Sequence, residues 1–291
     1  MPMTFPTMDM THVSVRGGHA FEPAFVQAED LLARPNDDRL FVDVRLGDPE
    51  IEYRAYRDGH IFGAVHGQIR DAFAAEPTPA SGNLPLPGLG QLADTLRNWG
   101  VGRDTEIVVY GPTPALAARG WWVLRWAGLA RVFLLDGGLK AWIAAGGALA
   151  RGDEPHRRRL PEVLSLAGGH LPQIEVDEVE RLPDGAVLVD ARDEASYLAG
   201  HIPGARHLAA SEFWTPSGRL RPAGERARLL AQAGLEPGDE AVVYCGGGVL
   251  SALVAMAMAD AGIRPRLYVG SWSEWNKDPE RMRRSAVGER A

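Results

Sequence analysis

Short apolar runs separated by helical patterns make up most of the chain. The runs lack the alternation of a half-exposed strand, which indicates strands buried on both faces of a sheet. We expect strands at 40–44, 107–110, 132–135, 187–189, 241–244 and 266–269, and helices at 92–99, 115–126 and 250–261. Strands that alternate with helices predict parallel βαβ units with right-handed crossovers, and hence an α/β fold.

The strand pattern occurs twice, and short motifs recur with it in the same order. "FVDVR" (41–45) returns as "LVDAR" (188–192), and "DGHIFGAVH" (58–66) returns as "AGHIPGARH" (199–207). "DTEIVVYG" (104–111) returns as "GDEAVVYC" (238–245), and "LDGGLKAW" (135–142) as "YVGSWSEW" (268–275). Ordered matches of this kind indicate a duplicated domain. We predict a first copy at 12–150, a linker rich in Arg, Gly and Pro at 151–172, and a second copy at 173–285.

The composition is that of ordinary globular domains. Of the 291 residues, 45% are hydrophobic and 24% are charged, which is enough to build two cores. A net charge of −7 argues against nucleic-acid binding, and the basic "HRRRL" at 156–160 has the surroundings of a solvated linker. The sequence shows no secretory pattern and no apolar run near the roughly 20 residues that span a bilayer. We therefore expect a cytoplasmic protein without membrane contacts.

The single cysteine occupies a distinctive position. Cys245 follows a predicted strand, precedes a predicted helix and is followed by three glycines. One cysteine excludes an intramolecular disulfide and a multi-thiolate zinc site. Glycines let the backbone curl so that amide donors approach the sulfur, and the N-terminal end of a helix favours a thiolate. Parallel sheets place sites beyond the carboxyl ends of their strands. The pattern favours a reactive thiol over a buried spacer.

These motifs resemble those of the tandem-domain rhodanese-like sulfurtransferases, the group of thiosulfate and 3-mercaptopyruvate sulfurtransferases, from about residue 12 to about residue 279. The resemblance implies two mainly parallel sheets flanked by helices, with catalysis confined to the second copy. The sequence agrees, because Gly111 stands in the first copy where Cys245 stands in the second. Pro112 and Pro114 also lack the N–H groups that an amide nest needs.

The resemblance implies sulfur transfer in two steps without a metal or an organic cofactor. The Cys245 thiolate takes the outer sulfur of a small donor and becomes a persulfide. A thiol, cyanide or a protein then accepts that sulfur. Substrate would bind at the catalytic loop, whose residues are Gly246, Gly247, Gly248, Val249, Leu250 and Ser251.

Arg192 is the second candidate, because its counterpart in the mercaptopyruvate enzymes helps to bind the substrate carboxylate. A guanidinium matches two carboxylate oxygens. The alternative is a structural ion pair, which Arg45 at the matching place in the first copy supports. Two further groups of repeated residues are interpreted as structural: Asp43 and Asp190 as loop anchors, and His60, His66, His201 and His207 as parts of the fold rather than metal ligands.

Departures from the family pattern leave the donor open. Thiosulfate enzymes typically carry Arg and Lys where this chain has Gly246 and Gly247. The mercaptopyruvate loop, Cys-Gly-Ser-Gly-Val-Thr-Ala, differs at three positions, which are here Gly247, Leu250 and Ser251. A second carboxylate-binding arginine aligns with Ser196, and an assisting aspartate aligns with Gln68.

The sequence leaves three other functions to compare with sulfur transfer. A phosphatase of the related fold needs Cys-x5-Arg, and position 251 is Ser. A dithiol oxidoreductase needs a second cysteine. A non-catalytic or sulfur-carrier module that acts through protein partners stays open beside the enzyme.

Overall fold

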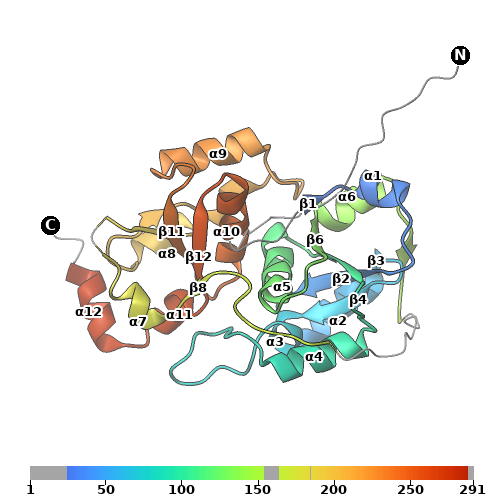
Figure 1. Cartoon of the computed structure of the whole chain (residues 1–291), viewed down its shortest axis with the longest axis horizontal. Coiled ribbons are helices and arrows are strands. Elements are labelled where there is room, and N and C mark those ends of the chain that lie inside the picture. Colours follow the sequence, from blue (N-terminus) through green and yellow to red (C-terminus); the bar gives the residue numbers. More distant parts are fainter. Residues whose placement is uncertain (1–24, 154–163, 184, 288–291) are drawn as a thin grey trace, which may run out of the picture.

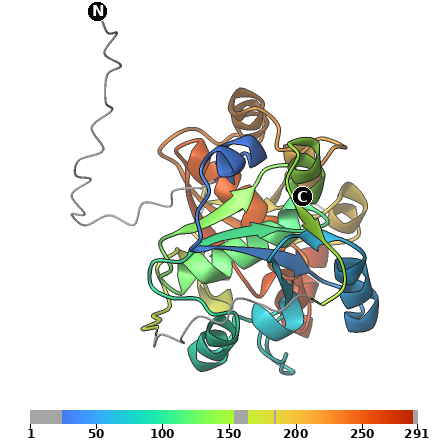
Figure 2. The same cartoon turned by 90° about the vertical axis from the view of Figure 1, so that its right-hand side faces the viewer.

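A computed structural model describes residues 25–153, 164–183 and 185–287. Each copy forms one five-stranded sheet flanked by helices, and the two copies lie side by side along the long axis of the molecule (Figure 1). In the perpendicular view the first copy faces the viewer and the second lies behind it (Figure 2). The predicted α/β fold with two mainly parallel sheets is confirmed.

The first sheet has the order β1-β6-β5-β2-β4, and all of its pairings are parallel. Its strands are β1 (Phe25–Val26), β2 (Arg39–Arg45), β4 (Val65–Gln68), β5 (Glu106–Tyr110) and β6 (Val132–Leu135). Its helices are α1 (Ala28–Ala33), α2 (Pro49–Asp58), α3 (Ile69–Ala72), α4 (Leu89–Asn98), α5 (Pro114–Trp126) and α6 (Gly138–Ala144). A separate antiparallel pair joins β3 (His60–Ile61) to β7 (Leu149–Ala150).

The second sheet repeats this arrangement. Its order β8-β12-β11-β9-β10 matches the first sheet strand for strand. Its strands are β8 (Gln173–Ile174), β9 (Val187–Asp190), β10 (Arg206–His207), β11 (Glu240–Tyr244) and β12 (Arg264–Tyr268). Its helices are α7 (Val176–Val179), α8 (Glu194–Leu198), the 3-10 helix η1 (Ala210–Phe213), α9 (Ala223–Gln232), α10 (Leu250–Asp260), α11 (Ser271–Trp275) and α12 (Pro279–Val287).

The strands predicted from apolar runs are the long inner strands of both sheets. Their observed bounds differ from the predicted ones by two residues or fewer. The edge strands β1, β8 and β10 span two residues each and carry no apolar run, so the sequence pattern does not reveal them. The charged segment 156–160 and the predicted start of the first copy at 12–24 lie outside the described residues.

The two copies share one continuous core. Helices α5 and α10 each follow the central strand of their sheet, and they pack against each other between the sheets (Figure 1). Both are apolar on nearly all sides, as expected for a helix covered by a sheet and by a second helix. This packing brings the start of α10, where Cys245 lies, next to the first copy. No helix among the described residues combines the length and the apolarity needed to cross a bilayer.

Candidate active site

Cys245 lies where the sequence predicts it, at the carboxyl edge of the second sheet. It follows the last residue of β11, and α10 begins five residues later at Leu250. β11 runs parallel to β9 with Tyr244 opposite Asp190, so the residues after both strands meet at one edge. The Cys245 side chain is only 1% exposed. The thiol is therefore held inside the loop that surrounds it.

The loop directs two hydrogen-bond donors at the sulfur. The Gly248 N–H donates to Cys245 Sγ at 3.2 Å, and the Ser251 hydroxyl donates to it at 3.4 Å. Both would stabilise a negative charge on the sulfur without having to reorient. Ser251 is fully buried, so water does not compete for its hydroxyl. A polar group therefore faces the sulfur although Leu250 replaces the usual loop threonine.

The three glycines of the loop have different reasons to be glycine. Gly248 has φ +80°, and a Cβ there would lie 2.8 Å from the Val269 carbonyl oxygen. Position 248 therefore requires glycine. Gly246 and Gly247 have no positive φ. A Cβ on Gly246 would meet no atom within 4 Å, and one on Gly247 would lie 3.8 Å from Leu84 Cδ1. The expectation that all three glycines clear space for the curl is correct for Gly248 alone.

The repeated "GSWSEW" motif clamps the catalytic loop from the next strand. Ser271 has φ +54°, an unusual conformation for a residue with a side chain. Its hydroxyl accepts the Cys245 N–H at 3.2 Å and donates to the Tyr268 carbonyl at 2.9 Å. The N–H groups of Trp272 and Ser273 donate to the carbonyls of Cys245 and Gly246, both at 2.9 Å. The motif is recognisable in the sequence as part of the repeat, but its contact with the catalytic loop is not.

Arg192 forms the ion pair that the alternative interpretation expected. Its Nε lies 3.0 Å from both carboxylate oxygens of Asp190, and Nη2 also donates to the Gly200 carbonyl at 2.6 Å. Its guanidinium lies 4.6 Å from the centre of the Trp272 ring. Nη1 donates no hydrogen bond to any described residue. Burial would lower the pKa of Arg192, but the bonds to Asp190 raise it above its usual value, so the cation is permanent.

A segment of the first copy covers the catalytic loop of the second. We call residues 76–88 the strap. The Asn83 N–H donates to Ser273 Oγ at 2.9 Å, and Lys277 Nζ donates to the Thr78 carbonyl at 3.0 Å. The Leu84 side chain faces Gly247. The strap has no sequence feature that points to the site, because the residues that it contacts lie nearly two hundred positions away.

Arg119 of α5 is a further residue that sequence reasoning missed. It is fully buried, and its Nη2 donates to the carbonyls of Phe73 and Leu84 at 3.0 and 2.9 Å. Its Nη1 donates to the Gly248 carbonyl at 3.4 Å. Burial lowers the pKa of Arg119 to about 10, against an opposing effect of the Cys245 charge, so the guanidinium is protonated at neutral pH. The only hint in the sequence is one cation inside the apolar run "ALAARGWW" (115–122).

The repeated histidines make contacts that belong to the fold. Nδ1 of His60 and of His201 bonds the carbonyl oxygen of a tyrosine four residues earlier, at 3.0 and 3.1 Å. Each ring also stacks on that tyrosine with the ring centres 4.0 Å apart. His207 Nε2 donates to the Arg192 carbonyl at 2.9 Å. Asp43 pairs with Arg45 as Asp190 pairs with Arg192, which agrees with the interpretation of both as loop anchors.

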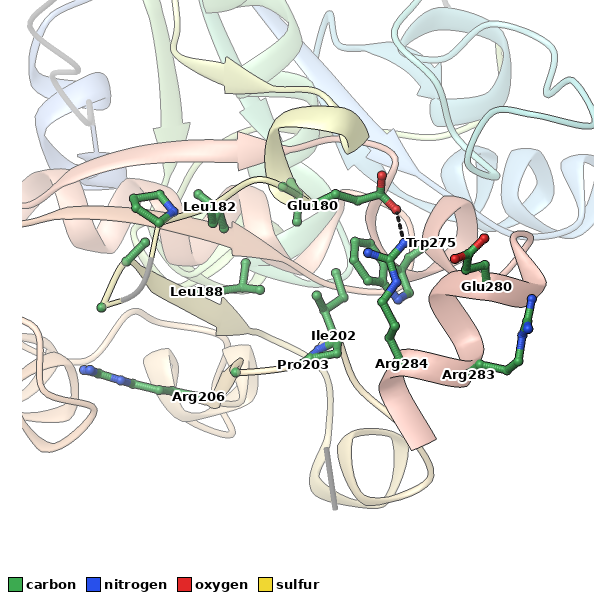
Figure 3. Close-up of a pocket in the computed structure, with 15 residues that line it drawn as sticks. Glu180, Leu182, Leu188, Ile202, Pro203, Arg206, Trp275, Glu280, Arg283 and Arg284 are labelled. Carbon is green, nitrogen blue, oxygen red and sulfur yellow. Dashed lines mark hydrogen bonds and ion pairs between the residues drawn. The ribbon is translucent and has the colours of Figure 1, made fainter. Parts of the chain in front are cut away.

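A cavity of about 890 Å³ lies in the second copy, beside a core cluster that contains Leu188, Ile202 and Trp275 but not Cys245 (Figure 3). Leu182, Leu188 and Trp275 line it, and an ion pair between Glu180 and Arg284 of α12 lies beside it. Leu188 belongs to the beginning of β9, whereas Cys245 follows the end of the neighbouring parallel strand. None of the site residues predicted from the sequence lines this cavity. Its size does not make it the reactive centre.

Comparisons with known proteins agree with this geometry. The family model of the rhodanese-like domain matches residues 27–145 and again 175–278. A Pseudomonas aeruginosa protein named "Probable 3-mercaptopyruvate sulfurtransferase" is 38% identical, with 87% of this chain and 95% of that protein covered. A thiosulfate sulfurtransferase of the same organism is 30% identical, with 86% and 95% covered.

Solved structures show the same architecture. The crystal structure of SseA from Escherichia coli, described as a 3-mercaptopyruvate sulfotransferase, superposes with a TM-score of 0.74 at 29% identity. The match covers 87% of this chain and 100% of that one. Because the family model matches both copies and the relatives align over most of their length, this chain belongs to the rhodanese-like sulfurtransferases and carries two rhodanese-like domains in tandem.

Proposed function

We propose that the protein moves sulfane sulfur through a persulfide on Cys245. The observation that carries the proposal is the sulfur itself, which lies between a strand end and a helix start and accepts hydrogen bonds from Gly248 and Ser251. A thiolate there is stabilised before any donor binds, and the same donors can serve the persulfide anion. The catalytic unit is the second copy, for which we keep the range 173–285.

In the first step, the outer sulfur of either donor passes to Cys245. With thiosulfate, the Cys245 thiolate attacks the outer sulfur, the S–S bond of the donor breaks, and sulfite leaves with the electron pair. With 3-mercaptopyruvate, the C–S bond breaks and its electron pair goes to carbon. That carbon takes the thiol proton, so pyruvate leaves. Both routes end with one extra sulfur on Cys245 and need no redox partner.

In the second step the persulfide gives up its outer sulfur. A thiolate or cyanide attacks that sulfur, and the Cys245 thiolate is released as the leaving group. A small thiol, cyanide or a thiol of an acceptor protein completes the cycle. Since the chemistry needs a reduced thiol, we propose that it takes place in the cytoplasm, where thiols are kept reduced.

The residues of the site favour a sulfur donor that carries a carboxylate, such as 3-mercaptopyruvate, over the small dianion thiosulfate. No cationic side chain stands in the loop, since Gly246 and Gly247 occupy the two positions after Cys245. The guanidinium of Arg192 stands at the next strand end, where its Nη1 can donate to a carboxylate of the substrate. We therefore propose 3-mercaptopyruvate as the better donor and thiosulfate as the weaker one.

Intact-mass measurement tests the proposal. The purified protein is exposed separately to 3-mercaptopyruvate and to thiosulfate, and the mass is read before and after treatment with cyanide. We expect a gain of one sulfur atom that cyanide removes, larger with 3-mercaptopyruvate, and no gain in the Cys245→Ser variant. A folded native protein that gains no sulfur from either donor would favour a non-catalytic module instead.

A further inference from the structure

We propose that Arg119, a residue of the catalytically empty first copy, is a positioning residue for Cys245. In this view it supplies the positive charge that keeps the Cys245 sulfur reactive, and it fixes both the catalytic loop and the strap. The effect of Arg119 on turnover rests on the proposed persulfide chemistry. Its effect on the reactivity of the Cys245 thiol does not.

Arg119 carries a positive charge inside the protein. Arg119 is fully buried, and its Nε has no hydrogen-bond partner among the described residues. Its other bonds go to the carbonyls of Phe73, Leu84 and Gly248, and no described carboxylate pairs with it. A buried cation is costly unless a negative charge lies nearby. Gly248 connects Arg119 to Cys245, since its carbonyl accepts from Arg119 Nη1 and its N–H donates to Cys245 Sγ. A negative charge on Cys245 would balance this buried cation.

The other ionisable groups around the loop do not provide the negative charge that would balance Arg119. Asp190 and Arg192 neutralise each other at the end of β9. α10 carries no ionisable side chain before Asp260, its last residue. On α11, Glu274 lies beside Tyr268, and burial raises its pKa. In the strap, Glu76 is largely solvent-accessible. Among the described residues, Arg119 is the buried arginine that has no carboxylate partner.

Arg119 also connects the two segments that enclose the sulfur. Gly248 donates its N–H to Cys245 Sγ and accepts Arg119 Nη1 at its own carbonyl. A Cβ on Gly248 would lie 2.9 Å from Nη1, so the guanidinium packs directly against this residue. Nη2 meanwhile holds the Leu84 carbonyl of the strap. One side chain thus fixes Gly248, whose N–H donates to the sulfur, and Leu84, which faces Gly247.

The two copies differ at the position of Arg119. Arg119 follows Gly111 by eight residues, as Leu253 follows Cys245 by eight residues. The two positions are equivalent on α5 and α10, the helices that pack against each other. The first copy therefore places a cation, Arg119, against the loop that contains Cys245, whereas the second copy has Leu253 at the equivalent position. Charge is supplied only where a thiolate can form.

Three variants test the proposal: Arg119→Met, Arg119→Lys, and Leu253→Met as a matched change of a buried residue at the equivalent position. For each we would measure thermal unfolding, kcat and KM, and the rate of Cys245 alkylation by uncharged iodoacetamide from pH 5 to pH 10. In Arg119→Met, we expect alkylation at neutral pH to slow at least about tenfold, and the midpoint of its pH profile to rise by at least about one unit. Arg119→Lys keeps the charge, so its midpoint stays close to that of the native protein. It still loses kcat, because an ammonium lacks the planar fork whose two separate nitrogens hold the Gly248 and Leu84 carbonyls.

The outcomes separate the proposal from a structural role. A folded Arg119→Met protein with the native alkylation profile overturns it, even if turnover falls. If Arg119→Met does not fold, Arg119→Lys decides, because a raised midpoint in the lysine variant also overturns the proposal. Leu253→Met should change none of the alkylation rates. Alkylation requires no sulfur donor, so a native protein that fails to form a persulfide refutes the proposed function and leaves this test intact.

Discussion

The two copies share a frame and differ at the loop that follows the central strand. In both, a tyrosine that ends this strand accepts a backbone N–H through its hydroxyl: Tyr110 from Ile61 at 3.1 Å, and Tyr244 from Ile202 at 3.0 Å. Gly138 and Ser271 occupy equivalent positions, and both have φ +54°. These details survive because packing and backbone hydrogen bonds require them whether or not a reaction takes place.

Each copy also covers the loop of the other. The strap of the first copy contacts the catalytic loop. In return, residues 214–220 of the second copy lie over the Gly111 loop, where the Leu220 N–H donates to Asp136 Oδ1 at 2.7 Å and Arg219 Nη1 donates to Gln27 Oε1 at 2.9 Å. A cavity of about 440 Å³ remains between this segment and the empty loop. Closure is therefore mutual, and only one of the two closed sites holds a thiol.

The empty loop differs from the catalytic one in its backbone as well as in the missing sulfur. A Cβ at Gly111 would lie 2.4 Å from the Val44 carbonyl oxygen. Thr113 caps α5 by accepting the Leu116 N–H at 3.4 Å, and Pro112 and Pro114 have no N–H to offer. The two loops therefore differ in their backbone N–H donors and in the contact of Arg119 with Gly248, although the two copies share one fold.

The largest expected effect comes from moving the cysteine to the empty copy. The double variant G111C/C245S should form no persulfide, and its sulfur transfer should stay at least about 1,000-fold below that of the native protein. The new side chain would meet Val44, so we also expect a loss of about 1–3 kcal/mol in unfolding free energy. Intact mass and thermal unfolding are compared with Cys245→Ser alone. Cyanide-removable sulfur on the double variant would show that the frame by itself can activate a thiol.

Breaking the equivalent ion pairs separates stability from catalysis. Arg192→Met and Arg45→Met each leave a fully buried aspartate unpaired, which should cost about 3–5 kcal/mol in unfolding free energy. Only Arg192→Met should also lower turnover, and more for 3-mercaptopyruvate than for an uncharged persulfide donor. Kinetics are measured below the unfolding range of both variants. Equal losses for the two donors would assign Arg192 to structure alone, as Arg45 is.

Adding charge to the loop sharpens the question of donor choice. The double variant G246R/G247K should lower the KM for thiosulfate about tenfold at low salt, because two cations would face a small dianion. Gly246 and Gly247 have no positive φ and have room for side chains, so the loop should keep its shape. G246Q/G247Q serves as the neutral control. A gain that persists at high salt, or that the glutamine variant shares, would contradict an electrostatic cause.

The smallest effect concerns two equivalent histidines. His207 Nε2 has a carbonyl partner, whereas the buried His66 Nε2 has no partner among the described residues. Burial lowers the pKa of His66 to about 4, and the charge of Arg45 adds to this. Between pH 4 and 6.5 the unfolded chain therefore binds a proton that the folded protein excludes, so stability falls as the pH falls. His66→Gln should reduce this acid sensitivity in urea unfolding, and an unchanged pH dependence would refute the assignment.

Part of the site follows directly from the sequence. Cys245, its loop and Arg192 are found because each stands directly after an apolar strand, where parallel sheets carry their sites. The three glycines look alike in the sequence, yet only Gly248 needs to be glycine, because φ and the approach of Val269 are set by the folded loop. The ion pair of Arg192 was one of two open alternatives, and the geometry shows that the pair is formed.

The duplication, the parallel sheets and the position of the thiol can be predicted from the sequence, because apolar periodicity and short motifs involve neighbouring residues. The surroundings of the sulfur cannot, because they depend on how the two copies pack together. Arg119 meets Gly248 across 129 positions of the chain, and Asn83 meets Ser273 across 190. Such contacts leave no local pattern, because they arise when α5 packs against α10 and the two copies share one core. Arg119, the cation that contacts the catalytic loop, belongs to the copy that has no cysteine.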